Sequence, residues 1–321
     1  MHNKYFTMKN YSNIFKPTKK NLIKAAKILK NSGIVALPTE TVYGLAANAY
    51  SAKAIHKVYQ LKKRPKKNPL IVHFDTLNSI KKETEPNLYL QKLFNKFSPG
   101  PITYVLKLKK SSRISRKLTN QSGTVACRVP ANSYFRKMIK LTKTPLAAPS
   151  ANVSNHVSPT SAKDVYDEFG KKIKFILDGK QSKIGLESTV INLVDKPSIL
   201  RPGKISITEI KRVIKNVKKN KSKKILSPGQ LKKHYSPGIP MYLNKKKPKI
   251  DGAYITFGRT NLKGKNIFNL SKQGSLEEVG KKLYQKLRFI KKQGFKNISV
   301  KKIPNQGIGI AINDRLKRAS S

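Results

Sequence analysis

The sequence predicts an α/β protein built from two domains. Over roughly the first 215 residues, short apolar runs typical of buried strands alternate with segments whose apolar residues recur at helical spacing. Residues 216–240 are rich in lysine, asparagine, serine, proline and glycine, which is typical of a linker. A second, shorter alternation of strands and helices follows over 241–321. At 321 residues the chain is long enough for two cores.

The first predicted helix delivers the chain into the stretch IVALPTETVYGLAANA, residues 34–49. Thr18 is expected to cap this helix, and Gly33 to end it. Residues 34–37 are predicted to form a buried strand that Pro38 terminates. Thr41 and its polar neighbours then follow a strand end, which is where ligands gather in α/β folds.

The second helix is predicted to begin after Ser51 and to end before Pro65. Lys62 is then near the helix end, and Arg64, which precedes the proline, is expected to be extended. Because these residues belong to the lysine run LKKRPKKN, a solvated surface is an alternative interpretation.

The rest of the first domain continues the alternation. Strands are expected at 69–74, 102–107, 124–130, 174–177, 188–193 and 198–201, and helices at 86–97, 134–141 and 161–169. Residues 145–154, PLAAPSANVS, are predicted to be a strand that breaks into small polar residues. In an extended chain, Ser150 and Asn152 would point to the same side. A single histidine within a strand, such as His73, is more often a core residue than a functional one.

The linker contains SPGQLKKHYSPGIP, residues 227–240, in which prolines and glycines bracket His234 and Tyr235. Such loops are often ordered and act as lids, although a passive linker is the alternative. Beyond it, strands near 253–257, 267–270 and 298–300 and helices over 275–291 and 310–318 indicate a small parallel three-layer unit.

The net charge of the chain indicates which kinds of partner it could bind. Lysine and arginine number 69 against 15 acidic residues, which gives a formal charge of +54. Such a surface attracts polyanions, although abundant lysine could equally reflect compositional bias. Only 11 of the 69 cations are arginine. An arginine within a motif is therefore expected to be needed for its planar guanidinium, which binds phosphate or carboxylate through two hydrogen bonds.

The single cysteine, Cys127, excludes an intramolecular disulfide and a cysteine-cluster metal site, and its apolar surroundings predict a buried thiol. No apolar run is long enough to span a membrane, and no signal peptide is evident. We therefore expect a cytoplasmic protein without a membrane contact.

No Walker loop, zinc spacing or serine-hydrolase elbow is present, so a nucleotide would need another kind of cradle. Lys62 and Arg64 as cations, with Ser150 and Asn152 as neutral donors, could surround a triphosphate. This Lys-x-Arg and Ser-x-Asn pair occurs together with PTETVYGLAANA, NPLIVHF, SPGPITYVLK, RVP, APSAN, GLESTV and ILRPG. In that order the motifs closely resemble the YrdC-like family, and the linker and the ending GIGIAINDRLKRA resemble its two-domain threonylcarbamoyl-AMP synthases.

The resemblance implies an enzyme, a nucleotidyltransferase, that converts L-threonine, bicarbonate and ATP with Mg²⁺ into threonylcarbamoyl-AMP and pyrophosphate. A downstream threonylcarbamoyl transferase complex would use the product to modify an adenosine next to the tRNA anticodon. The implied fold is a twisted mixed sheet with a concave basic face over 1–215, a linker and lid over 216–240, and a small Rossmann-like three-layer domain over 241–321.

The resemblance also implies the site residues. Those expected to hold L-threonine are Thr41, His73, Arg128, Ala148 and Ser188. Those expected around ATP are Arg64, Asn68, Thr124, Ser150, Ser158, Arg201 and Tyr235, with Lys62, Arg64, Ser150 and Asn152 as the catalytic signature. No protein metal site is expected, because the ATP phosphates would hold Mg²⁺.

Two other functions compete with this interpretation. A non-catalytic RNA-binding protein of ribosome assembly would use the basic face for tRNA or ribosomal RNA, but it would not need the two signatures. A carbamoyl transferase of protein maturation would need further segments that the sequence lacks. One departure from the family is DGK at 178–180 in place of a double glycine, which is expected to alter a turn.

Overall fold

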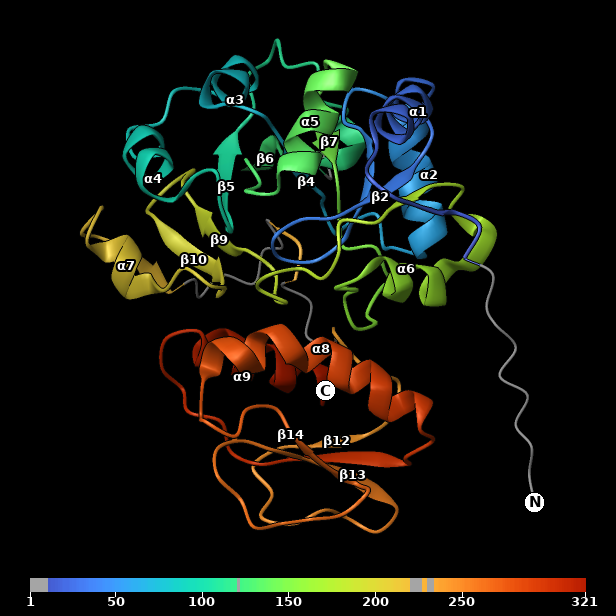
Figure 1. The fold of residues 1–321 in the computed structure, drawn as a ribbon. Helices are drawn as coiled ribbons and strands as arrows, with labels where there is room; N and C mark the ends of the chain where they lie inside the picture. The colour runs from blue at the N-terminus through green and yellow to red at the C-terminus, as the bar shows by residue number, and fades with distance from the viewer. Residues whose placement is uncertain (1–10, 120–121, 220–226, 230–233) are drawn as a thin grey trace.

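The computed structural model describes residues 11–119, 122–219, 227–229 and 234–321. Within them the chain forms two α/β units, each with its own sheet (Figure 1). The predicted linker over 216–240 is described only in part, because 220–226 and 230–233 lie outside the described residues.

The first unit contains an eleven-stranded mixed sheet in the order β1-β8-β2-β3-β7-β4-β6-β5-β9-β10-β11. Its strands are β1 (Ile14–Phe15), β2 (Val35–Leu37), β3 (Gly44–Asn48), β4 (Ile71–His73), β5 (Ile102–Lys107), β6 (Thr124–Arg128), β7 (Leu146–Ala147), β8 (Ile176–Leu177), β9 (Thr189–Asn192), β10 (Ser198–Arg201) and β11 (Lys218–Lys219). Its helices are α1 (Lys19–Lys30), α2 (Ala52–Lys62), α3 (Leu77–Glu83), α4 (Leu90–Phe97), α5 (Ser133–Thr142), α6 (Ala162–Phe169) and α7 (Ile207–Lys211).

The predicted helix starts are confirmed by their caps. The Thr18 hydroxyl accepts a hydrogen bond from Asn21 N, and the Ser51 hydroxyl accepts one from Ala54 N. Each cap satisfies a backbone donor that the first helical turn leaves free. These helices fix the loops that enter and leave the sheet at the site described below.

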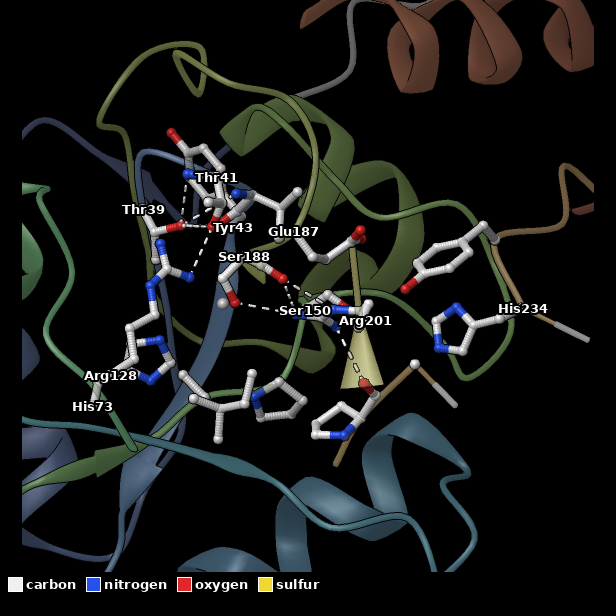
Figure 2. Close-up of a pocket in the computed structure, with 18 of the residues that line it drawn as sticks. Thr39, Thr41, Tyr43, His73, Arg128, Ser150, Glu187, Ser188, Arg201 and His234 are labelled. Carbon is white, nitrogen blue, oxygen red and sulfur yellow. Dashed lines mark hydrogen bonds between the residues drawn. The ribbon is translucent and has the colours of Figure 1, made fainter. Parts of the chain in front are cut away.

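The polar stretch after β2 contains a strand that the sequence did not predict. Residues 44–48, GLAAN, form β3, which pairs antiparallel with both β2 and β7. Thr41 is therefore in a tight connection between two antiparallel strands. Nearby, the parallel strands β4 and β6 bring His73 and Arg128 into register as direct partners (Figure 2).

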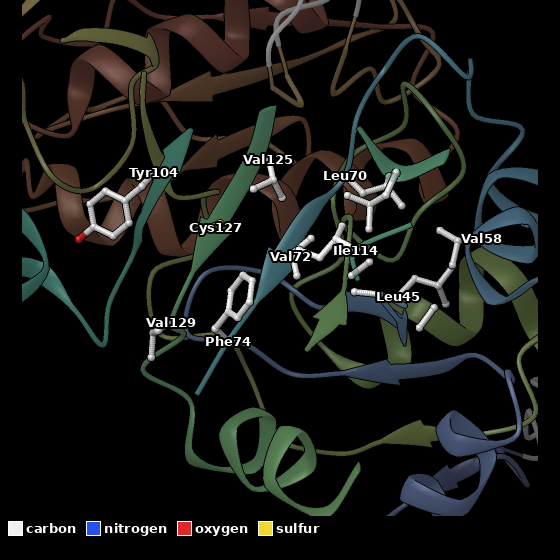
Figure 3. Close-up of a cluster of buried hydrophobic side chains, with 14 of the residues drawn as sticks. Leu45, Val58, Leu70, Val72, Phe74, Tyr104, Ile114, Val125, Cys127 and Val129 are labelled. Carbon is white, nitrogen blue, oxygen red and sulfur yellow. The ribbon is translucent and has the colours of Figure 1, made fainter. Parts of the chain in front are cut away.

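The core of the first unit lies behind these site strands. Figure 3 shows side chains of this core, a buried cluster that includes Val72 of β4 and Cys127 of β6 together with Leu45, Phe74 and Val125. The Cys127 thiol is buried, as the sequence predicted. Because close-packed cores tolerate little change in volume, this layer holds the strand ends at fixed positions.

The second unit has a smaller, wholly parallel sheet in the order β12-β15-β13-β14. Its elements are β12 (Met241–Tyr242), β13 (Gly252–Thr256), β14 (Ile267–Asn269), α8 (Leu276–Lys292), β15 (Asn297–Val300) and α9 (Gly309–Ala319). Both helices lie on the face of the sheet that is turned toward the first unit (Figure 1). The described unit therefore has two layers where the sequence suggested three, because loops make the connections from β12 to β13 and from β13 to β14.

The two units are in close contact. A Cβ on Gly185 would lie 2.5 Å from Gly280 O of α8, so the backbones meet where no side chain intervenes. Arg288 of α8 donates to Glu168 of α6 at 3.1 Å, and Arg315 of α9 donates to Glu187 at 2.8 Å. Within the described residues, no helix is long and apolar enough to cross a membrane.

Candidate active site

A cavity with an empty volume of about 520 Å³ lies where the strand ends, the connection between β2 and β3, and the linker meet. Figure 2 shows Thr41, His73 and Arg128 on one side of it, and Ser188, Arg201 and His234 on the other. Nine of the residues predicted from the sequence line this cavity, which is why we treat it as the candidate active site: Thr41, Arg64, His73, Arg128, Ala148, Ser150, Ser188, Arg201 and Tyr235.

Arg128 is held by three hydrogen bonds at the end of β6. Its guanidinium donates to Glu40 Oε1 at 2.6 Å, to Thr41 Oγ1 at 2.9 Å and to Gly100 O at 3.2 Å. Burial raises the pKa of the Glu40 carboxyl, but the charge and hydrogen bond of Arg128 outweigh it and leave that pKa lowered. The planar fork therefore has a fixed orientation beside the cavity, as a carboxylate clamp requires.

The connection between β2 and β3 supplies hydroxyls to the same wall. Thr39 Oγ1 accepts hydrogen bonds from the backbone N–H of Thr41 and of Val42, each at 3.1 Å, and lies 2.7 Å from Thr41 Oγ1. Such side chain to backbone bonds rigidify a tight turn. The turn explains why Thr41 is presented to Arg128 rather than to solvent.

Arg201, at the end of β10, lies on the opposite wall. Its guanidinium donates to Ser188 O at 3.0 and 3.1 Å and to Ser188 Oγ at 3.1 Å. Its Nη1 donates to Pro228 O of the linker at 3.3 Å. Arg201 therefore connects the end of β10 to the linker segment that covers the cavity.

The described part of the linker closes the cavity. Pro228, Gly229, His234 and Tyr235 all line it, and Tyr235 is buried in a left-handed backbone conformation with φ of 64°. Such a conformation costs a non-glycine residue roughly 1–3 kcal/mol and persists only where the surroundings enforce it. The described part of this segment forms one wall of the site, which disagrees with the alternative of a passive linker.

Three polar atoms at the cavity have no hydrogen-bond partner within the described residues, although they are buried. They are His73 Nδ1, His234 Nδ1 and the Tyr235 hydroxyl oxygen. Burial holds the pKa of His73 well below its usual value and lowers that of His234 to about 3, so both rings are neutral. Because buried polar groups are rarely left unpaired, these atoms indicate where a polar ligand binds.

Lys62 and Asn152, two residues of the predicted catalytic signature, are not among those that line the cavity, and their catalytic role stays a prediction. Lys62 Nζ donates to Ser150 O at 2.6 Å and to Asn152 O, so it braces the loop that carries both residues. The chain bends after Ser150, where Asn152 N donates to Ser150 O at 3.0 Å. Pairing with β3 reaches Ser150, which bridges Gly44, and bends follow at 151–153, so the strand predicted over 145–154 ends before Asn152.

Three residues predicted to contact ATP lie outside the cavity lining. Thr124 begins β6 while Arg128 ends it, so they occupy opposite ends of the strand. Ser158 donates to Glu187 Oε1 at 2.6 Å. Both polar side-chain atoms of Asn68 are buried and unpaired within the described residues, and Asn68 O accepts a bond from Arg64 Nε at 2.9 Å.

Glu187 is the lining residue that the sequence interpretation missed. Its carboxylate accepts hydrogen bonds from Ser158, from the Tyr284 hydroxyl at 3.0 and 3.2 Å, and from Arg315 Nε at 2.8 Å. Burial raises its pKa, but the charges of Arg315 and Arg201 and the donated bonds lower it to about 2. The available signal was its place beside Ser188 in the motif GLESTV.

The turn at 178–180, where the sequence departs from a double glycine, contacts a residue that lines the cavity. Lys180 takes a left-handed φ of 62°, a conformation that glycine adopts without strain. Tyr43, which lines the cavity, donates its hydroxyl to Lys180 O at 2.7 Å and accepts a bond from Gly179 N at 3.0 Å. The lysine therefore strains the turn without removing its contact with the site.

Two family models cover most of the chain. Residues 27–203 match the model described as "Telomere recombination" for Sua5, YciO and YrdC proteins, and residues 205–321 match "Threonylcarbamoyl-AMP synthase, C-terminal domain".

Individual relatives agree with these models over nearly the full length. The chain is 35% identical to threonylcarbamoyl-AMP synthase of Pyrococcus abyssi, with 92% of this chain and 93% of the relative covered. It is 34% identical to the Bacillus subtilis enzyme of the same name, with 93% and 92% covered. The structure of P. abyssi Sua5 complexed with L-threonine superposes with a TM-score of 0.88 at 31% identity, over 96% of this chain and 97% of that one.

Proposed function

The chain belongs to the threonylcarbamoyl-AMP synthase family, and on that premise we propose that it is an enzyme that makes threonylcarbamoyl-AMP and pyrophosphate from L-threonine, bicarbonate and ATP. The observation that carries the proposal is the cavity, where the oriented guanidinium of Arg128 and the Thr41 hydroxyl lie opposite Arg201 (Figure 2). A relative with the same fold has been solved with L-threonine bound.

The threonine half of the site is assigned to the walls around Arg128. Its guanidinium would bind the substrate carboxylate, since a planar fork matches a carboxylate in geometry and charge. Thr41 and Ser188 supply hydroxyls, and Ala148, whose Cβ would lie 3.1 Å from a Cβ on Gly44, adds a small apolar side chain to the wall. His73 is neutral and offers Nδ1 to a polar group of the substrate.

The ATP half is assigned to Arg64, Ser150, Arg201 and Tyr235. Arg64 lines the cavity, and its Nε and Nη2 hold Asn68 O and Pro69 O, so its guanidinium is fixed where it would meet a phosphate oxygen. The second arginine, Arg201, and the hydroxyls of Ser150 and Tyr235 complete a set of donors. Lys62 would act indirectly, by fixing the Ser150 loop through its backbone carbonyls.

The reaction depends more on how the protein positions the reactants than on covalent participation of its side chains. The threonine nitrogen attacks bicarbonate, water leaves, and a carbamate oxygen then forms a bond to the α-phosphorus of ATP. The bond from that phosphorus to the departing pyrophosphate breaks in line with the attack. Holding the reactants in place, excluding water and neutralising phosphate charge supply most of the catalysis.

We propose that Mg²⁺ enters with the ATP phosphates, where it would neutralise charge on the departing pyrophosphate. The acidic side chain that lines the cavity, Glu187, is already bound to Arg315, Tyr284 and Ser158. Within the described residues, no group of three histidine, cysteine or acidic side chains could hold a metal ion.

The decisive experiment incubates the purified protein with ATP, Mg²⁺, bicarbonate and L-threonine and measures pyrophosphate. Release that requires both threonine and bicarbonate, with threonylcarbamoyl-AMP detected by mass spectrometry, is the expected result. Release that is the same without threonine, or no release, would refute the proposal.

We further propose that the product passes to a threonylcarbamoyl transferase complex, and that the basic surface contacts tRNA directly. The formal charge of +54 motivates the tRNA contact. Affinity for tRNA should then fall steeply as salt rises, in proportion to the phosphates neutralised. Affinity that does not change with salt would assign the lysine excess to composition alone.

A further inference from the structure

Arg315, on the last helix of the second unit, reaches the wall of the cavity formed by the first. We infer that Arg315 is a positioning residue for the ATP half of the site, so that docking of the second unit completes that half. The inference rests on the proposed function and extends it to a residue outside the cavity.

The Glu187 carboxylate is held by residues of both units. Glu187 lines the cavity, and its partners come from both units: Ser158 from the first, Tyr284 and Arg315 from the second. Arg315 has about 1% of its side chain exposed, so the pair is shielded from water and screening is weak. Without Arg315, a buried carboxylate would remain beside the cavity without its counter-ion, which disfavours the observed geometry.

The Arg315 guanidinium fixes three parts of the cavity wall at once. Its Nε donates to Glu187 Oε2 at 2.8 Å, and its Nη2 donates to Pro202 O, next to Arg201, at 2.9 Å. Its Cζ lies 5.1 Å from the centroid of the Tyr235 ring, within the range of a cation–π contact. The Tyr235 ring also stacks on Tyr284, at 5.9 Å between centroids.

The contacts of Arg315 lie on the ATP half of the site. The three parts that Arg315 contacts adjoin Ser158, Arg201 and Tyr235, which are all assigned to ATP. The residues assigned to threonine near Arg128 are held instead by Glu40, Thr41 and Gly100 of the first unit. Ser188, which is assigned to threonine and adjoins Glu187, is held by Arg201 and not directly by Arg315, so a change at Arg315 should affect ATP more than threonine.

The test replaces Arg315 by lysine, which keeps the charge but loses the fork, and Tyr284 by phenylalanine, which removes only the hydroxyl on Glu187. Pyrophosphate release is measured against ATP and, separately, against L-threonine. Misplacement of a binding group by about 1 Å costs on the order of a hundredfold in rate. We expect Arg315→Lys to lower kcat/KM for ATP by roughly 10- to 100-fold and Tyr284→Phe to lower it less, with the KM for threonine within about twofold.

Two controls separate positioning from general stability. Lys292→Ala removes an ion pair with Asp167 that also joins the two units but lies away from the cavity. Ile298→Val weakens the buried core of the second sheet by removing one methylene group. Both controls should leave the KM for ATP unchanged.

Binding of a non-hydrolysable ATP analogue, measured by calorimetry, keeps the inference testable apart from activity. The analogue should bind both Arg315→Lys and Tyr284→Phe more weakly than the unmodified protein, with the larger loss of affinity in Arg315→Lys. If wild type binds the analogue but makes no adduct, the proposed function fails while this comparison still stands. Equal affinity in all variants, or equal losses for ATP and threonine, would overturn the inference.

Discussion

Replacing Arg128 by lysine tests the assignment of the threonine carboxylate. The guanidinium uses three different nitrogen atoms to reach Glu40, Thr41 and Gly100, at distances from 2.6 to 3.2 Å. One ammonium cannot occupy three such positions, nor offer a planar pair of donors to a substrate carboxylate. The positive charge remains, so Glu40 keeps a cation nearby and the variant is expected to fold.

The magnitude follows from the bonds lost. A hydrogen bond to a charged group contributes about 1.5–3 kcal/mol. Loss of one such bond to the substrate carboxylate corresponds to a rise of roughly 10- to 150-fold in the KM for L-threonine. The KM for ATP should change by less than about twofold, because Arg128 contacts none of the residues assigned to ATP.

The assay measures initial rates of pyrophosphate release over a range of L-threonine concentrations at saturating ATP. Arg136→Lys is the matched control, since Arg136 follows the same strand but donates to the backbone carbonyls of Pro130 and Ala131, each at 2.8 Å. A threonine KM that is unchanged in Arg128→Lys, or that rises equally in the control, would refute the reasoning.

Three further outcomes are expected. Gly203→Ala should lower stability by about 1–3 kcal/mol and reduce activity, because its Cβ would lie 2.2 Å from Thr189 N; an unchanged urea midpoint would contradict this. The pKa of Glu187 is lowered to about 2, so the stability it contributes is present above about pH 4.5 and is lost as the pH falls toward 2. That loss should reach roughly 3 kcal/mol, and acid unfolding of Glu187→Gln with the same pH dependence as wild type would argue against it. Lys180→Gly should raise stability by up to about 1 kcal/mol through relief of its left-handed φ, and a lower melting temperature would count against that strain.

Local sequence signals were sufficient where an element is bounded by a cap, a proline or a glycine. The caps at Thr18 and Ser51 and the strand Ile102–Lys107 are examples, because their patterns depend on near neighbours. β3 was missed for the opposite reason. Its sequence GLAAN has little intrinsic preference for a strand, and pairing with β2 and β7 imposes the conformation.

The site shows the same division between local and distant causes. Arg128, Thr41 and Ser188 could be named from family motifs, and they line one cavity. Asn152 was expected beside Ser150, but the bend between them depends on Lys62, which approaches from the end of another helix. Glu187 was missed because its importance arises from Arg315, 128 positions further along the chain.

The position of Arg201 has a consequence for how the two substrates influence each other. Its guanidinium holds Ser188, on the threonine side, and Pro228, in the segment that covers the nucleotide side. A ligand that shifts this group changes both walls, so the two affinities are not independent. Thermodynamic linkage makes the effect reciprocal: the factor by which threonine changes the affinity for ATP equals the factor by which ATP changes the affinity for threonine.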